Sequence, residues 1–209
     1  MGWYPIVIEM TGRPVLVIGG GAVAERKVQG LLAAGARVTV LAPEVTARLR
    51  AWVREGRIGH VGRAYRTGDL EGYGVAFAAT DDGEVNAAVA GEARERSVWL
   101  NAADDPGHSD FILPSVLRRG DVVVAVTTGG ASPALARAVR EELEEHLTED
   151  HAALASIVAE VRRTVRQRPN PPDAEAWRHA LDDRLRRLVA EGRRGEATSL
   201  LLERLGARA

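Results

Sequence analysis

The sequence contains no cysteine, a single lysine and no long uninterrupted apolar run. The absence of cysteine excludes disulfide bonds, thiolate metal ligands and cysteine nucleophiles. None of the apolar runs is long enough to cross a bilayer, and the amino terminus lacks a basic region followed by a long apolar segment. We therefore expect a cytoplasmic protein that is not attached to a membrane.

An excess of one charge is also absent, because 28 lysines and arginines stand against 29 aspartates and glutamates, for a formal net charge of -1. Proteins that bind nucleic acid through its phosphates usually carry a basic surface, so the composition disfavours a nucleic-acid partner. We attribute the scarcity of lysine, which occurs only at Lys27, to the base composition of the gene. With 209 residues, the chain can bury a substantial core, as one large domain or as a medium domain with a smaller appendage.

The most informative motif is an apolar run that ends at a glycine cluster and continues as a helical pattern. In the spacing Gly19-x-Gly21-x-x-Ala24, Gly19 permits a tight turn, Gly21 lets the backbone approach a pyrophosphate, and Ala24 lets the helix pack closely on the strand. The unpaired N–H groups and the positive end of the helix dipole would face the phosphates. The pattern predicts a dinucleotide site formed by Gly19, Gly20, Gly21, Ala22, Val23 and Ala24. A glycine turn with a purely structural role is the alternative.

The surrounding sequence strengthens this prediction, because a strand over 14–18, a helix over 23–34 and a strand over 37–42 form a βαβ unit. An acidic partner for the adenosine ribose is expected about 20 residues after the glycines. The second strand ends at Leu41-Ala42-Pro43-Glu44, so Pro43 and Glu44 are the candidates there. Glu44 equally suits a first-turn charge that favours a helix dipole. No arginine directly follows the strand to hold a 2′-phosphate, which favours NAD over NADP.

Strands and helices continue to alternate, with helices expected over 43–55 and 82–96 and strands over 58–61, 75–79 and 98–101. This order predicts a Rossmann-like, mostly parallel sheet with helices on both faces, whose ligands collect at the carboxyl ends of the strands. The strand ends bring in Ala79 and Thr80, beside a ribose or nicotinamide, and the segment from Asn101 to Pro106. The sequence Thr80-Asp81-Asp82 equally suits a plain helix N-cap with first-turn acids.

The remainder of the chain predicts a strand over 121–128, a helix from Pro133 to about Leu147 capped by Ser132, and then only helices. Amphipathic helices are expected over 150–166, 173–191 and 196–205. Because these helices carry few large apolar residues, we expect them to pack onto another part of the protein or onto a second chain.

Several motifs occur in one order along nearly the first 145 residues: Tyr4-Pro5-Ile6, Gly19 to Lys27, Ala78 to Asp82 with Val85-Asn86, Asn101 to Pro106, Ser109 to Ser115, and Thr127 to Arg137. Together they resemble the precorrin-2 dehydrogenase family, the sirohaem-synthase dehydrogenase/ferrochelatase proteins. The resemblance implies oxidation of precorrin-2 to sirohydrochlorin with NAD+ as hydride acceptor. Some relatives also insert ferrous iron into the product to give sirohaem.

The resemblance also implies an intertwined homodimer with residues 122–126 and the helix after Pro133 near the interface. We accordingly divide the chain into an NAD-binding Rossmann-like domain over 1–113, a strand–helix dimerisation segment over 114–147 and a small all-α domain over 148–209. In fused relatives a methyltransferase domain follows. Because the sequence stops at Ala209, we expect methylation to be supplied by a separate protein.

Asp104 matches the family aspartate implicated in catalysis, and a carboxylate at a strand end could accept the proton lost together with the hydride. Its alternative role is to cap the turn before Asp105-Pro106. The resemblance, with the second glycine-rich turn, assigns substrate binding to Asn101, Asp105, Thr128, Gly129, Gly130 and Arg137. Amides of that turn and the following helix terminus could bind a substrate carboxylate, although a tight strand-to-helix connection would look the same.

The sequence departs from the family at two positions: Thr128 stands where relatives usually have serine, and Ser109 where they commonly have cysteine. Serine removes a possible thiolate contact with metal, which weakens the chelatase interpretation. The five histidines show no metal-ligand spacing, so no metal site is predicted. Two other functions remain, an NAD(H)-sensing regulator without catalysis and a chelatase with a vestigial nucleotide site. The intact Gly19, Gly21 and Ala24 argue against the second.

Overall fold

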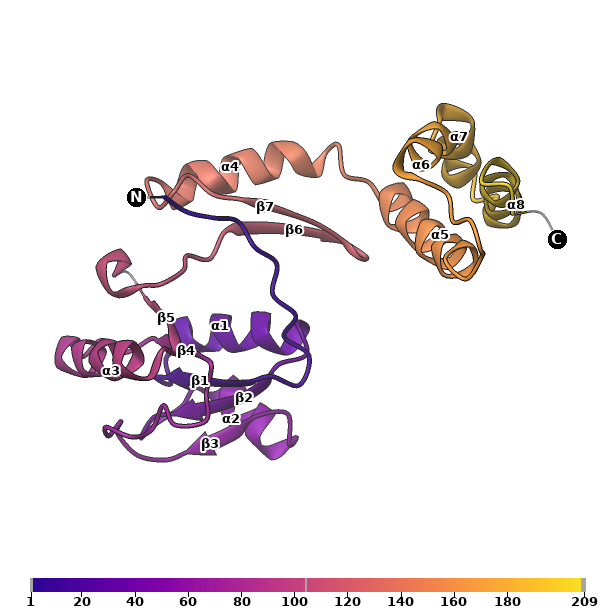
Figure 1. Ribbon diagram of the computed structural model, residues 1–209. Coiled ribbons are helices and arrows are strands. Elements are labelled where there is room, and N and C mark those ends of the chain that lie inside the picture. The colour runs from indigo at the N-terminus through magenta and orange to yellow at the C-terminus, as the bar shows by residue number, and fades with distance from the viewer. Residues whose placement is uncertain (1, 104, 208–209) are drawn as a thin grey trace. The chain divides into compact units, whose positions relative to one another are not determined.

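The computed structural model describes residues 2–103 and 105–207, which fall into two units, Met1–Leu113 and Pro114–Ala209 (Figure 1). The first unit is built on a five-stranded sheet in the order β3-β2-β1-β4-β5. Its strands are β1 (Pro14–Ile18), β2 (Arg37–Leu41), β3 (Gly59–Val61), β4 (Val75–Ala78) and β5 (Trp99–Ala102). All neighbouring strands in this sheet pair in parallel. The predicted Rossmann-like parallel sheet is therefore confirmed.

Both faces of this sheet are covered by helices, because the central strands are apolar at successive positions. The helices are α1 (Ala22–Ala33), α2 (Ala47–Arg54) and α3 (Gly83–Arg96), with a short 3₁₀ turn η1 (Pro106–His108) after β5. On one face, Ala24 and Val28 of α1 pack with Val15 and Val17. On the other, Val89 of α3 packs in the cluster that contains Leu16 and Ile18. This arrangement buries β1 on both sides, as expected for a parallel sheet.

The helix expected over 43–55 begins later than the sequence pattern predicted. Thr46 is its N-cap, and the Thr46 hydroxyl accepts a hydrogen bond from the amide of Leu49 at 3.1 Å. Pro43 and Glu44 form a bend before the helix. The interpretation of Glu44 as a first-turn charge of this helix is therefore wrong, because the threonine supplies the cap two residues further on.

A buried carboxylate holds the irregular segment between β3 and β4. Glu92 of α3 accepts hydrogen bonds from the Tyr65 hydroxyl and from the amides of Gly68, at 2.9 Å, and Leu70, at 3.3 Å. Arg96 lies 2.7 Å from the same carboxylate. Burial alone raises the pKa of Glu92, but these hydrogen bonds and the arginine outweigh it and leave the pKa below its ordinary value.

The second unit begins with a hairpin of β6 (Ser115–Arg119) and β7 (Val122–Val126), which pair antiparallel, and α4 (Pro133–Glu144) lies along it (Figure 1). The sequence analysis predicted β7 but not β6. Pro114 precedes β6 and Gly120 follows it, and both residue types are typical of turns, while Arg118 and Arg119 make its end polar. Gly120 has a φ of +54° in the turn that joins the two strands. The hairpin pairing, which is not visible in the local pattern, decides the structure there.

The remaining elements are the helices α5 (Glu149–Val165), α6 (Ala174–Ala180), α7 (Asp183–Ala190) and α8 (Arg194–Arg204). They share a hydrophobic core that includes Ile157, Leu185 and Leu201. The single helix expected over 173–191 is wrong, because Asp182 caps α7 through the amide of Leu185 at 2.9 Å and separates it from α6. Across the described part of the chain, no helix is both long and apolar enough to span a membrane.

Candidate functional site

The carboxyl ends of four parallel strands meet along one edge of the first unit. The amide of Gly19, after β1, donates to the carbonyl of Leu41 in β2 at 2.9 Å. The amide of Ala79, after β4, donates to Ile18 at 2.7 Å, and the amide of Ala103, after β5, donates to Ala78 at 2.8 Å. The predicted strand ends therefore lie side by side, where ligands of such sheets bind.

Two of the three glycines are required by the protein's own backbone. A Cβ atom at Gly19 would lie 2.1 Å from the carbonyl oxygen of Ala79, and Gly19 has a φ of +115° that favours glycine. A Cβ atom at Gly20 would lie 1.9 Å from the carbonyl oxygen of Glu44. These contacts draw the loops after β1, β2 and β4 together.

Gly21 differs, because a Cβ atom there would meet nothing within 4 Å among the described residues. It is the N-cap of α1 and provides no side-chain cap for the first amides of the helix. The neighbouring Ala22 is exposed and Val23 half-buried, whereas Ala24 is fully buried against the sheet. An uncapped helix N-terminus with open space beside it is suited to a phosphate-containing ligand.

Pro43 and Glu44 are exposed and lie next to this loop. The carbonyl of Glu44 packs against Gly20, and the amide of Thr46 donates to the Gly20 carbonyl at 3.0 Å. The Thr46 hydroxyl also donates to Glu25 of α1 at 2.6 Å. The strand end that carries the predicted ribose partner is thus fastened to the glycine loop at several points.

Thr80 contributes its hydroxyl to the start of α3. The Thr80 hydroxyl contacts the side chain of Asn86 at 3.1 Å and accepts from the amide of Asp82 at 3.1 Å. Asp82 is the N-cap of α3 and accepts from the amides of Glu84 and Val85. The helix-cap interpretation of this segment is confirmed, and the backbone of Ala79 remains beside Gly19.

The side chain of Asn101 is 7% exposed and points into the protein rather than to an open surface. Its Oδ1 accepts a hydrogen bond from Lys27 Nζ at 2.7 Å, and its Nδ2 donates to the carbonyl of Phe111 at 2.9 Å. The sequence pattern did not indicate Lys27 as the partner of Asn101. Its occurrence as the one lysine in an arginine-rich chain was the available signal.

Asp105 caps η1 and accepts from the amides of Gly107, at 3.1 Å, and His108, at 3.2 Å. Its other oxygen lies 2.5 Å from Nδ1 of His108, and this hydrogen bond holds the pKa of the Asp105 carboxyl below its usual range. The Ser109 hydroxyl accepts from the amide of Ala102 at 2.9 Å and so closes the segment after β5. Asp104, the predicted catalytic residue, lies outside the described residues.

The second glycine-rich turn lies in the other unit and is closed by its own hydroxyl groups. The Thr128 hydroxyl accepts from the amide of Ser132 at 2.9 Å and lies 3.0 Å from the Ser132 carbonyl oxygen. The Ser132 hydroxyl accepts from the amide of Leu135 and caps α4. Gly129 and Gly130 take φ values of +66° and +88°. These contacts form the tight strand-to-helix connection that was one of the two interpretations.

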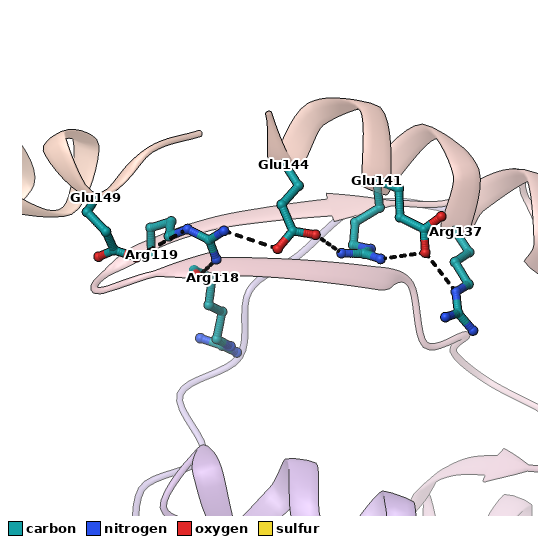
Figure 2. Close-up of polar contacts among 7 residues, drawn as sticks. Arg118, Arg119, Arg137, Glu141, Glu144 and Glu149 are labelled. Atoms are coloured by element: carbon teal, nitrogen blue, oxygen red, sulfur yellow. Dashed lines mark hydrogen bonds and ion pairs between the residues drawn. The ribbon is translucent and has the colours of Figure 1, made fainter. Parts of the chain in front are cut away.

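Arg137 is exposed and pairs with Glu141 one helical turn away, with 2.9 Å between Nε and Oε1. Figure 2 shows this pair as the end of a continuous series of ion pairs along α4, β6 and the start of α5. The series runs through Glu149, Arg119, Glu144, Arg140, Glu141 and Arg137. The neighbouring Arg118 points away from α4 (Figure 2).

No group of three histidine, aspartate or glutamate side chains suited to holding a metal ion occurs among residues 2–103 and 105–207. In the same part of the chain, His60 contacts the carbonyl of Ala42 at 2.9 Å and His151 contacts the Thr148 hydroxyl at 3.2 Å. These imidazoles serve local backbone and hydroxyl contacts.

Comparison with known families matches each unit separately. Residues 6–115 match a family model described as "Putative NAD(P)-binding", and residues 119–146 match one described as "Sirohaem biosynthesis protein central". The first match covers the whole five-stranded sheet and its glycine loop. The unit with the uncapped α1 is therefore a member of an NAD(P)-binding family.

Comparison with individual proteins gives relatives over most of the chain. A siroheme synthase of Methylococcus capsulatus is 40% identical over 205 residues, which are 97% of this chain and 43% of the relative. A siroheme synthase of Methylobacillus flagellatus is 43% identical over 168 residues, 80% of this chain and 36% of the relative. The chain thus spans less than half the length of these relatives.

Among solved structures, SirC, a precorrin-2 dehydrogenase, superposes with a TM-score of 0.78 at 25% sequence identity, and covers 96% of this chain and 100% of its own. The order of the motifs, the two family models and these relatives agree with one another. The chain belongs to the family of the siroheme synthases and precorrin-2 dehydrogenases.

Proposed function

We propose that this chain oxidises precorrin-2 to sirohydrochlorin, with NAD+ as the hydride acceptor. The observation that carries the proposal is the uncapped N-terminus of α1 beside Gly21, in a unit that matches an NAD(P)-binding family. SirC, which superposes on nearly the whole chain, is a precorrin-2 dehydrogenase.

The residues of the first glycine loop fit a dinucleotide. We assign its diphosphate to the backbone of Gly19, Gly20 and Gly21 and to the first amides of α1 at Ala22, Val23 and Ala24. The strand ends at Ala79 and Thr80 supply a backbone surface for the nicotinamide half. When bound, NAD+ supplies the chemistry of accepting a hydride from carbon.

We assign the adenosine half to the loop that follows β2, at Pro43 and Glu44. The Glu44 carboxylate suits the two hydroxyls of an unphosphorylated ribose and repels a 2′-phosphate. The nearest arginine along the chain, Arg48, lies 3.9 Å from Glu25 and 5.0 Å from the ring of Trp52. These contacts favour NAD over NADP.

Loss of a hydride from a reduced tetrapyrrole is balanced by loss of a proton elsewhere on the macrocycle. We assign that proton to Asp104, which follows β5 in the sequence, because a carboxylate can act as a general base. We assign the substrate's carboxylates to Arg137 and to the backbone of the turn around Thr128, Gly129 and Gly130. We also assign substrate binding to Asn101 and Asp105, which flank Asp104 in the sequence. Arg137, 75% exposed, keeps its terminal nitrogens on the surface.

We further propose that the chain consists of a nucleotide-binding domain over 1–113, a dimerisation segment over 114–147 and a helical domain over 148–209. Residues 114–147 would form the interface of a homodimer. A hairpin of two strands is marginally stable by itself. Val116 and Val123, on the hairpin face opposite α4, are 42% and 41% exposed. A second copy of the same segment would cover these valines. Light scattering is expected to report a dimer for the natural sequence and a monomer for Val123→Arg, and a monomer for both would contradict this assignment.

The enzymatic proposal is tested by anaerobic incubation of the purified protein with precorrin-2 and NAD+, following NADH absorbance and the tetrapyrrole spectrum. NADH formed in step with loss of precorrin-2 is the expected result, slower with NADP+. Ferrous iron is added after the oxidation, because faster formation of sirohaem than in a protein-free control would add iron insertion to the assignment. If neither NADH nor NADPH formed, the enzymatic proposal would be contradicted. Binding of NAD+ without turnover would favour an NAD(H)-sensing regulator.

A further inference from the structure

Lys27 connects the helix of the glycine loop to the far edge of the sheet. It lies on α1, and its ammonium lies 5.3 Å from the centroid of the Phe77 ring in β4 before it reaches Asn101 in β5. The distance between Nζ of Lys27 and Oδ1 of Asn101 is 2.7 Å. The Lys27 side chain thus reaches from α1 over β4 to β5.

Asn101 continues this connection to the segment that follows η1. Its Nδ2 donates to the carbonyl of Phe111 at 2.9 Å, and the rings of Phe111 and Phe77 meet edge to face with 5.6 Å between centroids. Because Asn101 is buried, its side-chain amide needs hydrogen-bond partners within the protein. Loss of the Lys27 ammonium would remove the hydrogen bond that Oδ1 accepts from it.

The segment between Asn101 and Phe111 is also fastened to β5 by two side chains. The amide of Leu100 donates to Asp110 Oδ2 at 2.8 Å, and the amide of Asp110 donates back to the Leu100 carbonyl at 2.8 Å. The hydroxyl of Ser109 accepts from the amide of Ala102 at 2.9 Å. Lys27 therefore contacts, through Asn101, a short loop whose two ends are hydrogen-bonded to β5.

We propose that Lys27 is a positioning residue, which holds the end of β5 and residues 109–111 in register with the helix that begins at the nucleotide-binding loop. The inference rests on the proposed function, since the segment between Asn101 and Phe111 contains Asp104 and the other end of the connection is the helix that binds the cofactor. Lys27 acts through Asn101 and sets the placement of the segment relative to that helix.

Lysine suits this role because its compact ammonium lies over the Phe77 ring while it donates to a single amide oxygen. Lys27→Met keeps the stem and removes the donor. Arg26→Met is the matched control, because Arg26 is the adjacent cation on the same helix and is exposed.

The first test measures steady-state kinetics of precorrin-2 oxidation and NAD+ affinity. Lys27→Met is expected to lower kcat by about tenfold or more while the dissociation constant for NAD+ changes less than about twofold, because only the placement of reacting groups is lost. Arg26→Met is expected to leave both unchanged. The double variant Lys27→Met with Asn101→Ala is expected to be no slower than the slower single variant. Independent, multiplying losses would show that Lys27 does not act through Asn101 and would overturn the proposal.

The second test does not depend on activity: hydrogen–deuterium exchange of peptides that cover residues 100–111. Lys27→Met is expected to speed exchange there and to leave peptides of β1 and β2 unchanged. Lys27→Gln, which retains a donor, is expected to give an intermediate rate and serves if the methionine variant does not fold. Unchanged exchange overturns the inference. If the natural protein forms no NADH, the proposed function fails, and the exchange result alone decides whether Lys27 holds the segment.

Discussion

Two connections in this protein pass from a strand through glycines into a helix, and they solve the same geometrical problem differently. At Gly19–Gly21, the glycines are forced by neighbouring backbone, and the helix N-cap is itself a glycine without a capping side chain. At Thr128–Ser132, the glycines take left-handed conformations, and the hydroxyls of Thr128 and Ser132 satisfy the turn and the first amides of α4.

The difference separates a helix whose first amides have no side-chain cap from a helix whose first amides are capped by its own serine. The orphan amides of a helix must find partners, either in a side chain or in a bound group. α4 finds one in Ser132, whereas α1 has none at its N-cap. A glycine-rich spacing therefore predicts a turn at both places, and the capping residue distinguishes the turn that we propose for the cofactor phosphates.

The largest effect is expected for Gly20→Ala, which breaks the first connection. The new Cβ would lie 1.9 Å from the Glu44 carbonyl oxygen, so the loop after β2 must move. We expect the free energy of unfolding to fall by about 3 kcal/mol, with loss of NAD+ binding. Urea unfolding and calorimetric titration measure the two quantities. A variant of natural stability would show that the contact with Glu44 is not needed.

Gly21→Ala is expected to separate binding from folding. The added methyl meets no atom of residues 2–103 and 105–207 within 4 Å, so the free energy of unfolding should change by less than about 1 kcal/mol. The dissociation constant for NAD+ should rise by about tenfold or more, because the methyl occupies the approach of the diphosphate. Gly83→Ala, in the first turn of α3 and equally unobstructed, is the matched control and should leave NAD+ binding unchanged. If Gly21→Ala bound NAD+ as tightly as Gly83→Ala does, the nucleotide would have to bind elsewhere than at Gly21.

Ser132→Ala tests the second connection, with the opposite pattern. Loss of the N-cap hydroxyl should lower the free energy of unfolding by about 1 kcal/mol and leave the dissociation constant for NAD+ unchanged. Thermal unfolding and calorimetric titration of the same preparation supply both values. Weaker NAD+ binding without loss of stability would contradict the assignment of this turn as self-capped.

The smallest effect is expected for Asp105→Asn, where a carboxylate of the first unit caps η1 as Ser132 caps α4. The pKa of Asp105 is lowered in the folded protein by the hydrogen bond from His108. Its stabilising contribution is therefore present above the pKa of an unfolded aspartate, about 4, and is lost as pH falls through the lowered folded value. Unfolding curves at a series of pH values should show Asp105→Asn less stable near neutrality and equal to the natural protein in acid. A constant difference at all pH values would contradict this.

The fold of the first unit followed from the sequence because the central strands β1 and β4 are continuous apolar runs that end at glycine or small residues. The strand over 14–18 and the positions of Gly19 and Ala24 depend on local pattern alone. β6 could not be predicted in this way, since Arg118 and Arg119 give it a polar pattern, and its strand structure comes from pairing with Val122 and Val123. The break between α6 and α7 depends on a single cap at Asp182 that an amphipathic pattern does not reveal.

The candidate site was predictable where only one residue type fits the backbone, as at Gly19 and Gly20. It was not predictable where a side chain is paired across a long sequence separation. Asn101 and Lys27 are 74 residues apart in the sequence. They meet because β4, over which the Lys27 ammonium lies, is next to β5 in the sheet. Thr80, Asp105 and Thr128 carry polar groups that suit either a ligand or their own turn, and the structure shows each of them engaged with its turn.

The central claim is that the open terminus at Gly21 binds the nicotinamide cofactor that oxidises precorrin-2. Its most direct test is NADH formation under anaerobic conditions by the natural protein and by Gly21→Ala at equal folded concentration, over a range of NAD+. The natural protein should form NADH in step with the loss of precorrin-2, and the variant should do so only at about tenfold higher NAD+ or above. Identical curves, or no reduced cofactor from the natural protein with either nucleotide, would contradict the account.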